Sequence, residues 1–229
     1  MKAEYIYHLW SDLTVVNAAR VSMDKESDWL CERDDVQNID TYILPQGDKR
    51  LLKYLATHNH WTPFSHPQIT MRETVPIFVA RQRFKHMVGF TYNEVSRRYV
   101  DTPPELFDVQ HRLRPDGSIK QGSSGNTNNV PTVEIAGYSF SLADVREGLL
   151  DWYDEAVGSE YKIAPETARA ELPQSMYTSF YVTGSLSAWA RAYKQRIDPH
   201  AQVEIQDLAK QWGSIISPLY PESWEALTR

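Results

Sequence analysis

Two patterns in the sequence predict an α+β fold. Apolar and polar residues alternate over 69–75, which is typical of a strand, while apolar residues recur every three or four positions over 201–215, which is typical of a helix. Strands and helices are mixed without the regular strand–helix–strand order of a parallel sheet. With 229 residues, of which 41% are hydrophobic, we expect one domain over residues 1–229, and wholesale disorder is excluded.

The N-terminal elements follow from alternation and capping. The first ten residues alternate and predict a strand, after which Ser11 or Asp12 can cap a helix. Residues 24–47 are acidic and irregular, so they predict a loop. Asp48 can cap a second short helix, and residues 58–66 are too rich in proline and polar groups to form a regular element.

The middle of the chain predicts a strand that runs into a helix. Residues 68–75 form the strand, and Pro76 stands where a helix favours its first residue, ahead of a helix over 77–87. Residues 110–131 are rich in Gly, Ser and Asn, and apolar periodicity resumes on both sides of them. We expect a mobile polar surface excursion there rather than a domain linker.

The C-terminal part predicts three helices and a strand. Ser141 can cap a helix over 142–156, and residues 176–182 alternate as a strand does. A further helix runs from Gly184 toward Arg196, and the last one covers 201–215.

Composition and charge exclude several classes of protein. The net charge of -6 argues against a general nucleic-acid binder, and no apolar run approaches the roughly 20 residues of a membrane helix. The first residues lack the pattern of a signal peptide, and the single Cys31 cannot form an internal disulfide. We therefore expect a cytoplasmic protein that binds neither membrane nor nucleic acid. Nothing near Cys31 would activate it as a nucleophile.

A basic island lies between Arg81 and Arg98. It holds five cations against Glu94 alone, a local charge of +4. If residues 77–87 are helical, Gln82, Lys85 and His86 share one face, and residues 93–98 form a loop that presents hydroxyl, guanidinium and backbone N–H groups. These groups suit a phosphate monoester, although a solvated helix face would explain the charge as well.

Other residues leave alternatives open. Three histidines in residues 58–66, with Asp198 and His200, could bind a metal in a nucleotide phosphohydrolase, or could hydrogen-bond locally. The basic island with its aromatic residues could stack on single-stranded RNA. Arg196 at a helix end is stabilised by the helix dipole, or points into a cleft. Arg169 stands between acids, as in a surface ion pair.

A set of motifs in the sequence resembles those of the flavin-dependent thymidylate synthases. Their signature is Arg-His-Arg, seven or eight residues, then Ser; here Lys85-His86-Met87, eight residues and Ser96 fill it. The matching segments occur in the family's order, and they are Ala19-Arg20-Val21-Ser22, residues 58–66, residues 76–82, residues 93–99 and residues 196–202. Lysine and methionine replace the two arginines of the signature, which removes bidentate contact at Lys85 and all charge at Met87.

The resemblance implies a mixed α/β domain of that family, assembled as a homotetramer with FAD at subunit junctions. It implies dUMP as the substrate, methylenetetrahydrofolate as the carbon donor, NADPH as the reductant and dTMP as the product. Arg196 would stabilise negative charge on the uracil ring. His60 matches a histidine near the flavin and folate, and we count it with Arg196 as catalytic. Arg169 would reach the nucleotide from a neighbouring subunit.

The resemblance also assigns the binding residues by position. The implied substrate contacts are Gln82, Arg83, Phe84, Lys85, Glu94, Val95, Ser96, Arg97, Arg98, Arg169 and Arg196. The implied flavin contacts are Ser22, Thr62, Lys85, His86, Met87, Glu94, Ser185, Leu186, Ser187, Arg191 and His200.

Overall fold

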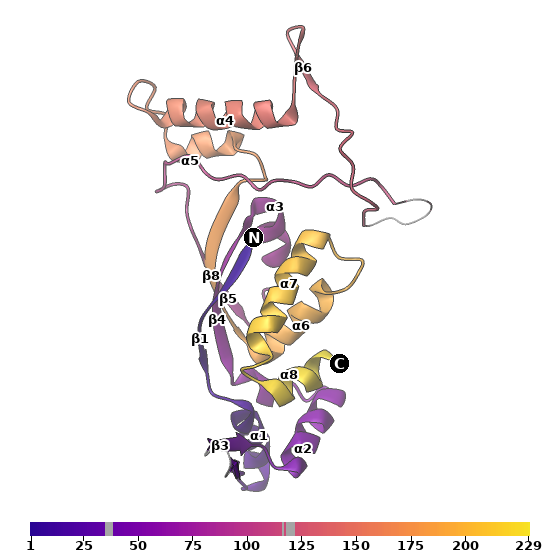
Figure 1. The fold of residues 1–229 in the computed structure, drawn as a ribbon. Helices are drawn as coiled ribbons and strands as arrows, with labels where there is room; N and C mark the ends of the chain where they lie inside the picture. Colours follow the sequence, from indigo (N-terminus) through magenta and orange to yellow (C-terminus); the bar gives the residue numbers. More distant parts are fainter. Residues whose placement is uncertain (35–38, 116, 118–121) are drawn as a thin grey trace. The chain divides into compact units, whose positions relative to one another are not determined.

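The computed structural model of the chain describes residues 1–34, 39–115, 117 and 122–229 (Figure 1). The elements in chain order are β1 (Lys2–Leu9), α1 (Asp12–Arg20), η1 (Val21–Met23), β2 (Leu30–Asp34), β3 (Ile39–Ile43), α2 (Gln46–Thr57), η2 (Pro63–Ser65), β4 (Gln68–Pro76), α3 (Ile77–Arg83), β5 (Phe90–Glu94), β6 (Val133–Ile135), β7 (Tyr138–Phe140), α4 (Leu142–Val157), α5 (Pro165–Ala168), η3 (Arg169–Glu171), β8 (Tyr177–Ser185), α6 (Leu186–Arg196), α7 (Val203–Ile216) and α8 (Pro221–Thr228). This mixture of helices and strands confirms the α+β prediction.

The chain divides into two compact units. Unit 1 comprises Met1, Glu73–Lys85 and Asn93–Phe180, and unit 2 comprises Lys2–Arg72, His86–Tyr92 and Tyr181–Arg229. The boundary falls inside strands β4, β5 and β8. We describe each unit by itself.

The largest sheet has the strand order β1-β4-β8-β5. Two of its strands show the burial expected from their alternation. In β4, Ile69, Met71 and Val75 are fully buried while Arg72 is exposed, and in β8 the side chain of Tyr181 is exposed between buried neighbours. Both strands were predicted from the sequence, and both predictions are confirmed.

Helices form the core of unit 2. Helix α6 contacts both α7 and α8, and α2 contacts α8; these helices can be followed in Figure 1. Trp189 and Trp212 are fully buried with their rings 5.5 Å apart, and the indole N–H of Trp189 donates to the carbonyl of Ile69 at 3.1 Å. The α6–α7 pair therefore packs around aromatic side chains.

In unit 1, helix α4 begins where the sequence predicts. Ser141 and Asp144 form a capping box, with the hydroxyl of Ser141 accepting from the backbone N–H of Asp144 at 3.2 Å. Tyr153 and Ala156 are the buried residues of α4, which contacts α5. The β6–β7 hairpin precedes α4 and turns at Ala136 and Gly137, both with positive φ.

The predicted loop over 24–47 is wrong over residues 30–34 and 39–43. Strands β2 and β3 form an antiparallel hairpin there, with Leu30 opposite Ile43. The side chains of β3 from Ile39 to Tyr42 are all exposed, so this strand has no buried face that would impose an apolar alternation on the sequence. Residues 35–38 of the predicted loop lie outside the described part of the chain.

Two predicted helices have different bounds. Helix α2 begins at Gln46, and Asp48 accepts from Arg20 Nε at 3.0 Å instead of capping the helix. Helix α3 ends at Arg83, and Pro76 precedes it with an extended backbone. The predicted helix over 77–87 is confirmed as far as Arg83. Its extension to residue 87 is wrong, and so is the shared face of Gln82, Lys85 and His86, because the chain turns after Arg83 to enter β5 at Phe90.

The remaining expectations concern the last helix and the excursion. Helix α7 begins at Val203, and α8 follows it, so the helix expected over 201–215 is not the last. In the expected excursion, Arg112 bridges to Asn126, so the segment folds back on itself. Residues 116 and 118–121 of that segment lie outside the description. None of the described helices is long and apolar enough to cross a membrane.

Candidate active site

The two units divide the predicted site residues between them. Every predicted substrate contact except Arg196 lies in unit 1. Every predicted flavin contact except Lys85 and Glu94 lies in unit 2, as does His60. The site therefore consists of two clusters, each of which has its own geometry.

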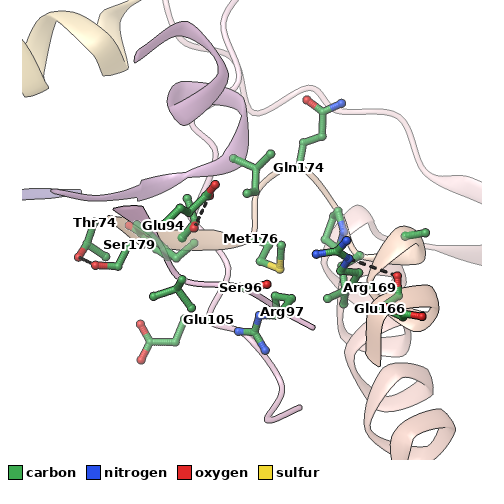
Figure 2. Close-up of a pocket in the computed structure, with 17 residues that line it drawn as sticks. Thr74, Glu94, Ser96, Arg97, Glu105, Glu166, Arg169, Gln174, Met176 and Ser179 are labelled. Carbon is green, nitrogen blue, oxygen red and sulfur yellow. Dashed lines mark hydrogen bonds between the residues drawn. The ribbon is translucent and has the colours of Figure 1, made fainter. Parts of the chain in front are cut away.

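A pocket of about 850 Å³ lies in unit 1, where β5 passes into residues 95–97. In Figure 2, Thr74, Glu94 and Ser179 lie on one side of it, and Arg169 with Glu166 lies on the other. The lining consists of Thr74, Ile77, Glu94, Val95, Ser96, Arg97, Glu105, Glu166, Arg169, Ala170, Leu172, Pro173, Gln174, Met176, Tyr177, Thr178 and Ser179. The structure thus brings together five predicted substrate contacts, namely Glu94, Val95, Ser96, Arg97 and Arg169.

Strand β8 fixes one wall of this pocket. The backbone N–H of Val95 donates to the carbonyl of Ser179 at 2.9 Å, and the hydroxyl of Thr178 donates to Glu94 Oε1 at 2.7 Å. Glu94 therefore has a partner that holds its carboxylate. It ends strand β5, so the loop expected to begin at Asn93 begins one residue after Glu94.

Hydrogen bonds within the turn after β5 stabilise its conformation. Tyr99 N–H donates to the carbonyl of Ser96 at 3.0 Å, and the backbone N–H of Arg98 donates to the hydroxyl of Ser96 at 3.4 Å. Arg97 donates to the carbonyl of Thr102. These bonds present Ser96 and Arg97 to the pocket, while exposed Arg98 lies over the Tyr99 ring and is absent from the described lining.

Arg169 approaches the pocket from the short helix η3. It is exposed, and its Nε donates to the carbonyl of Glu166 at 3.2 Å. The resemblance implied that Arg169 reaches a neighbouring subunit's nucleotide, whereas here it lines the same pocket as Ser96 and Arg97 of its own chain. Two guanidinium groups at one pocket suit an anionic ligand.

The residues from Gln82 to Lys85 are not among the described lining residues. Arg83 and Glu73 are fully buried and form an ion pair in which Arg83 Nε donates to both carboxylate oxygens at 3.1 Å. Phe84 packs on Phe180 with 4.8 Å between ring centroids. Arg83 therefore exposes no atom to a ligand, and its geometry is that of a structural residue.

In unit 2, the segment from His86 to Gly89 runs along helix α6 in the opposite direction to the helix. Arg196 Nε donates to His86 Nε2 at 2.8 Å, Arg191 donates to the carbonyl of Val88, and Ser185 N–H donates to the carbonyl of Gly89 at 3.2 Å. The structure thus brings three predicted flavin contacts and Arg196 together.

Backbone geometry holds this segment close to α6. Gly89 has a φ of 80°, and a Cβ there would stand 2.9 Å from Ala188 Cβ. Glycine is therefore required for both conformation and space. The neighbouring Met87 and Val88 are 73% and 74% exposed, so they offer an apolar surface to a ligand.

Hydroxyl groups gather at the N-terminus of α6. The Ser187 hydroxyl lies 2.7 Å from that of Ser65 and 3.1 Å from that of Ser185, which also caps the helix by accepting from Ala188 N–H. Hydroxyls, the positive end of an 11-residue helix and the exposed Arg191 together suit a pyrophosphate. The donor set of unit 2 therefore fits FAD, with apolar Met87 and Val88 available to its ring.

Four other residues that the resemblance places near the flavin also belong to unit 2. Ser22 is exposed and donates to the carbonyl of Ala19 at 3.0 Å, and His200 pairs with Asp198 at 2.9 Å. Exposed His60 lies 6.0 Å from the Tyr54 ring. Thr62 is exposed and stands at the start of η2.

The alternative of a metal-dependent phosphohydrolase gains no support. Across the described ranges, no three His, Cys, Asp or Glu side chains gather in a way that could hold a metal ion. His58 instead hydrogen-bonds the carbonyl of Tyr54 at 2.8 Å, and His66 lies beside Trp10.

Sequence reasoning missed several lining residues. Thr178 lies in a predicted strand, and the alternation of that strand could have shown that Thr178 points to the same face as Met176. Glu105 and Gln174 carry no motif, and only the folded chain brings them to the pocket. Ser65 lies in a matched segment but was not assigned to the flavin side.

The chain belongs to the thymidylate synthase complementing protein family, whose profile matches residues 6–222. This confirms the resemblance found in the sequence. The chain is 31% identical over 227 residues to the flavin-dependent thymidylate synthase of Thermosipho africanus, which covers 95% of this chain and 86% of that protein. It is 32% identical to the flavin-dependent thymidylate synthase of Thermosipho melanesiensis, over 96% of this chain and 87% of that protein.

A solved structure shares the fold. The UMP/dUMP methylase PolB from Streptomyces cacaoi, bound with 5-Br dUMP, superposes with a TM-score of 0.71 at 25% identity, covering 99% of this chain and 94% of PolB. A second structure of PolB, bound with 5-Br UMP, has the same TM-score.

Proposed function

We propose that the chain is a flavin-dependent thymidylate synthase. It converts dUMP to dTMP with methylenetetrahydrofolate as the carbon donor and NADPH, through FAD, as the source of hydride. The observation that carries this proposal is the unit 1 pocket, which gathers Ser96, Arg97 and Arg169 from separate parts of the chain. A cytoplasmic setting agrees with the single exposed Cys31.

The pocket suits a nucleoside monophosphate. Its volume of about 850 Å³ lies within the usual range of small-molecule sites. We assign Arg97 and Arg169 to the phosphate because guanidinium groups donate to phosphate in a bidentate manner. Ser96 offers a hydroxyl to the base, and exposed Arg98, in the turn after Ser96, supplies a further cation for the phosphate.

Arg196 acts on the uracil ring. A guanidinium stays protonated at any physiological pH, so Arg196 can stabilise negative charge as N3 ionises and C5 becomes the nucleophile. Its Nε is held by His86 at 2.8 Å, which limits the movement of this cation. Gln82, Lys85 and His60 remain proposed ligand contacts.

The flavin-side residues hold FAD. We assign the pyrophosphate to Ser185, Ser187 and Arg191, where hydroxyl donors meet the N-terminus of α6. Met87 and Val88 supply apolar surface for the ring. When bound, FAD carries the hydride from NADPH to the one-carbon unit on the nucleotide. The protein supplies binding, orientation and the fixed charge of Arg196.

We propose a homotetramer with active sites at subunit junctions. Strand β1 supports this because Tyr5, Ile6, Tyr7 and Leu9 are between 37% and 47% exposed on a strand at the end of the sheet order. Exposed apolar strands of this kind are covered in assemblies. Light scattering should give the mass of four chains of 26.5 kDa each; a monomer would contradict the proposal.

Analysis of the nucleotide product tests the activity. The protein is incubated with FAD, NADPH, methylenetetrahydrofolate and either dUMP or UMP, because the similar structure is that of a UMP/dUMP methylase. We expect mass spectrometry to show dUMP with one added methyl group, and none when NADPH is omitted or when bound FAD has been removed from the protein. Product formed without FAD, or unchanged dUMP, would contradict the proposal.

A further inference from the structure

We propose that His86 is a positioning residue for Arg196. As a neutral imidazole with its proton on Nδ1, it accepts the Nε–H of Arg196 at Nε2 and so restricts the orientation of the guanidinium that acts on the substrate. The proposal rests on the role proposed above for Arg196 and adds to it a residue that acts through Arg196.

The hydrogen bond itself determines where the proton of His86 lies. A guanidinium has five N–H donors and no acceptor, so Arg196 can only donate across the 2.8 Å contact. His86 Nε2 must therefore present a lone pair. A neutral imidazole carries one N–H, which then stands on Nδ1. A protonated His86 would face Arg196 with a second donor and a second positive charge.

His86 is well placed to act as a rigid anchor. Its side chain is 8% exposed, and the hydroxyl of Tyr92 donates to its backbone carbonyl at 2.6 Å. Tyr92 belongs to β5, whereas Arg196 is the last residue of α6. The contacts therefore run from a strand through His86 to the end of a helix, and they fix a side chain that would otherwise have many rotamers.

Holding Nε determines the direction of the rest of the guanidinium. The group is planar and its Nε is bonded to Cδ of the side chain, so fixing the Nε–H direction restricts the orientations open to the two Nη atoms. Electrostatic stabilisation of a developing charge depends on donors that are oriented before the reaction begins. Loss of His86 should therefore slow the chemical step more than it weakens the binding of dUMP.

Glutamine separates this role from a need for imidazole itself. The side-chain oxygen of glutamine can occupy the place of Nε2 and accept the same hydrogen bond, whereas alanine cannot. With FAD saturating, His86→Ala should lower kcat roughly 10- to 100-fold, because small misplacements of a catalytic group have effects of that size. His86→Gln should stay within about threefold of wild type, and KM for dUMP should change by less than about threefold in both.

Nitrogen-15 NMR of histidine-labelled holoenzyme tests the hydrogen bond without turnover. The His86 signals are identified by their loss in His86→Gln. We expect Nε2 to resonate as an unprotonated nitrogen and Nδ1 as a protonated one, and Arg196→Met to turn this into a mixture of tautomers. A proton on Nε2 in the wild-type holoenzyme would overturn the proposal.

The kinetic outcomes are equally decisive. Unchanged kcat in His86→Ala, or an equal loss in the alanine and glutamine variants at full flavin content, would overturn the positioning role. Absence of dTMP from the wild-type enzyme would remove the proposed function and this role with it. A wrong tautomer in an active enzyme would remove the positioning role alone, so the two failures are distinguishable.

Discussion

Arg83 and Glu73 form an ion pair whose two side chains are both fully buried, with Arg83 Nε 3.1 Å from each carboxylate oxygen. The pair joins the last turn of α3 to strand β4. It explains why an arginine within the basic island serves the fold rather than a ligand.

Breaking this pair should destabilise the protein strongly. Arg83→Met leaves a buried carboxylate without its cation, so the free energy of unfolding should fall by about 3–5 kcal/mol. The double variant Glu73→Leu/Arg83→Met should recover most of that loss, because it leaves no buried charge. Urea unfolding measures the free energy of unfolding of the single and the double variant. Arg81→Met is the control, since Arg81 is exposed on the same helix. A single variant as stable as the control would contradict this account.

Arg169→Ala should weaken the binding of dUMP. A hydrogen bond from a charged group contributes roughly 1.5–3 kcal/mol, which corresponds to an increase in KM of about 10- to 150-fold. Steady-state kinetics at saturating FAD measures the change. Arg146→Ala is the matched control, because Arg146 lies in unit 1 outside this pocket. If both variants kept the wild-type KM, the phosphate would not be bound at Arg169.

Acidification should stabilise the protein through Asp12. This residue is buried and accepts from the backbone N–H groups of Glu222 and Ser223 at 2.9 and 3.0 Å, which caps α8. Burial raises the pKa of Asp12 above that of an unfolded chain. The folded state therefore keeps a proton over a pH range in which the unfolded state has lost it, and this contribution to stability falls as pH rises through that range.

The difference in stability between wild type and Asp12→Asn isolates that contribution, because other groups titrate in both proteins. We expect the difference to shift in favour of wild type as pH is lowered from neutrality toward the unfolded-state pKa of about 3.9. Urea unfolding at several pH values measures it. A shift in favour of the asparagine variant on acidification would show that the pKa is lowered instead.

Gly89→Ala should reduce flavin retention. The substitution places a Cβ at a φ of 80° and 2.9 Å from Ala188 Cβ, so the segment from His86 to Gly89 must move away from α6. Gly137→Ala is the control, because Gly137 has a φ of 84° with nothing within 4 Å of the added atom. Both carry backbone strain of roughly 1–2 kcal/mol. Only Gly89→Ala should lower the ratio of flavin absorbance to protein; equal ratios would place FAD elsewhere.

Strong local patterns made much of the fold predictable. Buried alternation identified β4 and β8, and the capping residue Ser141 located the start of α4. The β2–β3 hairpin escaped prediction because its exposed side chains leave no apolar pattern. The end of α3 at Arg83 escaped as well, because it depends on the turn that leads into β5.

The sequence allowed us to predict which residues belong to the candidate site, but only some of the contacts between them. The resemblance to the family pointed to Ser96, Arg169 and Arg196, yet no spacing showed that Ser96 and Arg169 line one pocket. The bond between His86 and Arg196 joins residues 110 positions apart. Contacts of that range arise only from the packed chain.

The visible absorption spectrum of the purified protein tests the central claim most directly. After incubation with FAD and removal of the excess, we expect a flavin band that NADPH bleaches under anaerobic conditions and that returns on addition of dUMP with methylenetetrahydrofolate. Two results would contradict a flavin-dependent thymidylate synthase: a protein that retains no flavin, or a bound flavin that stays oxidised after NADPH is added.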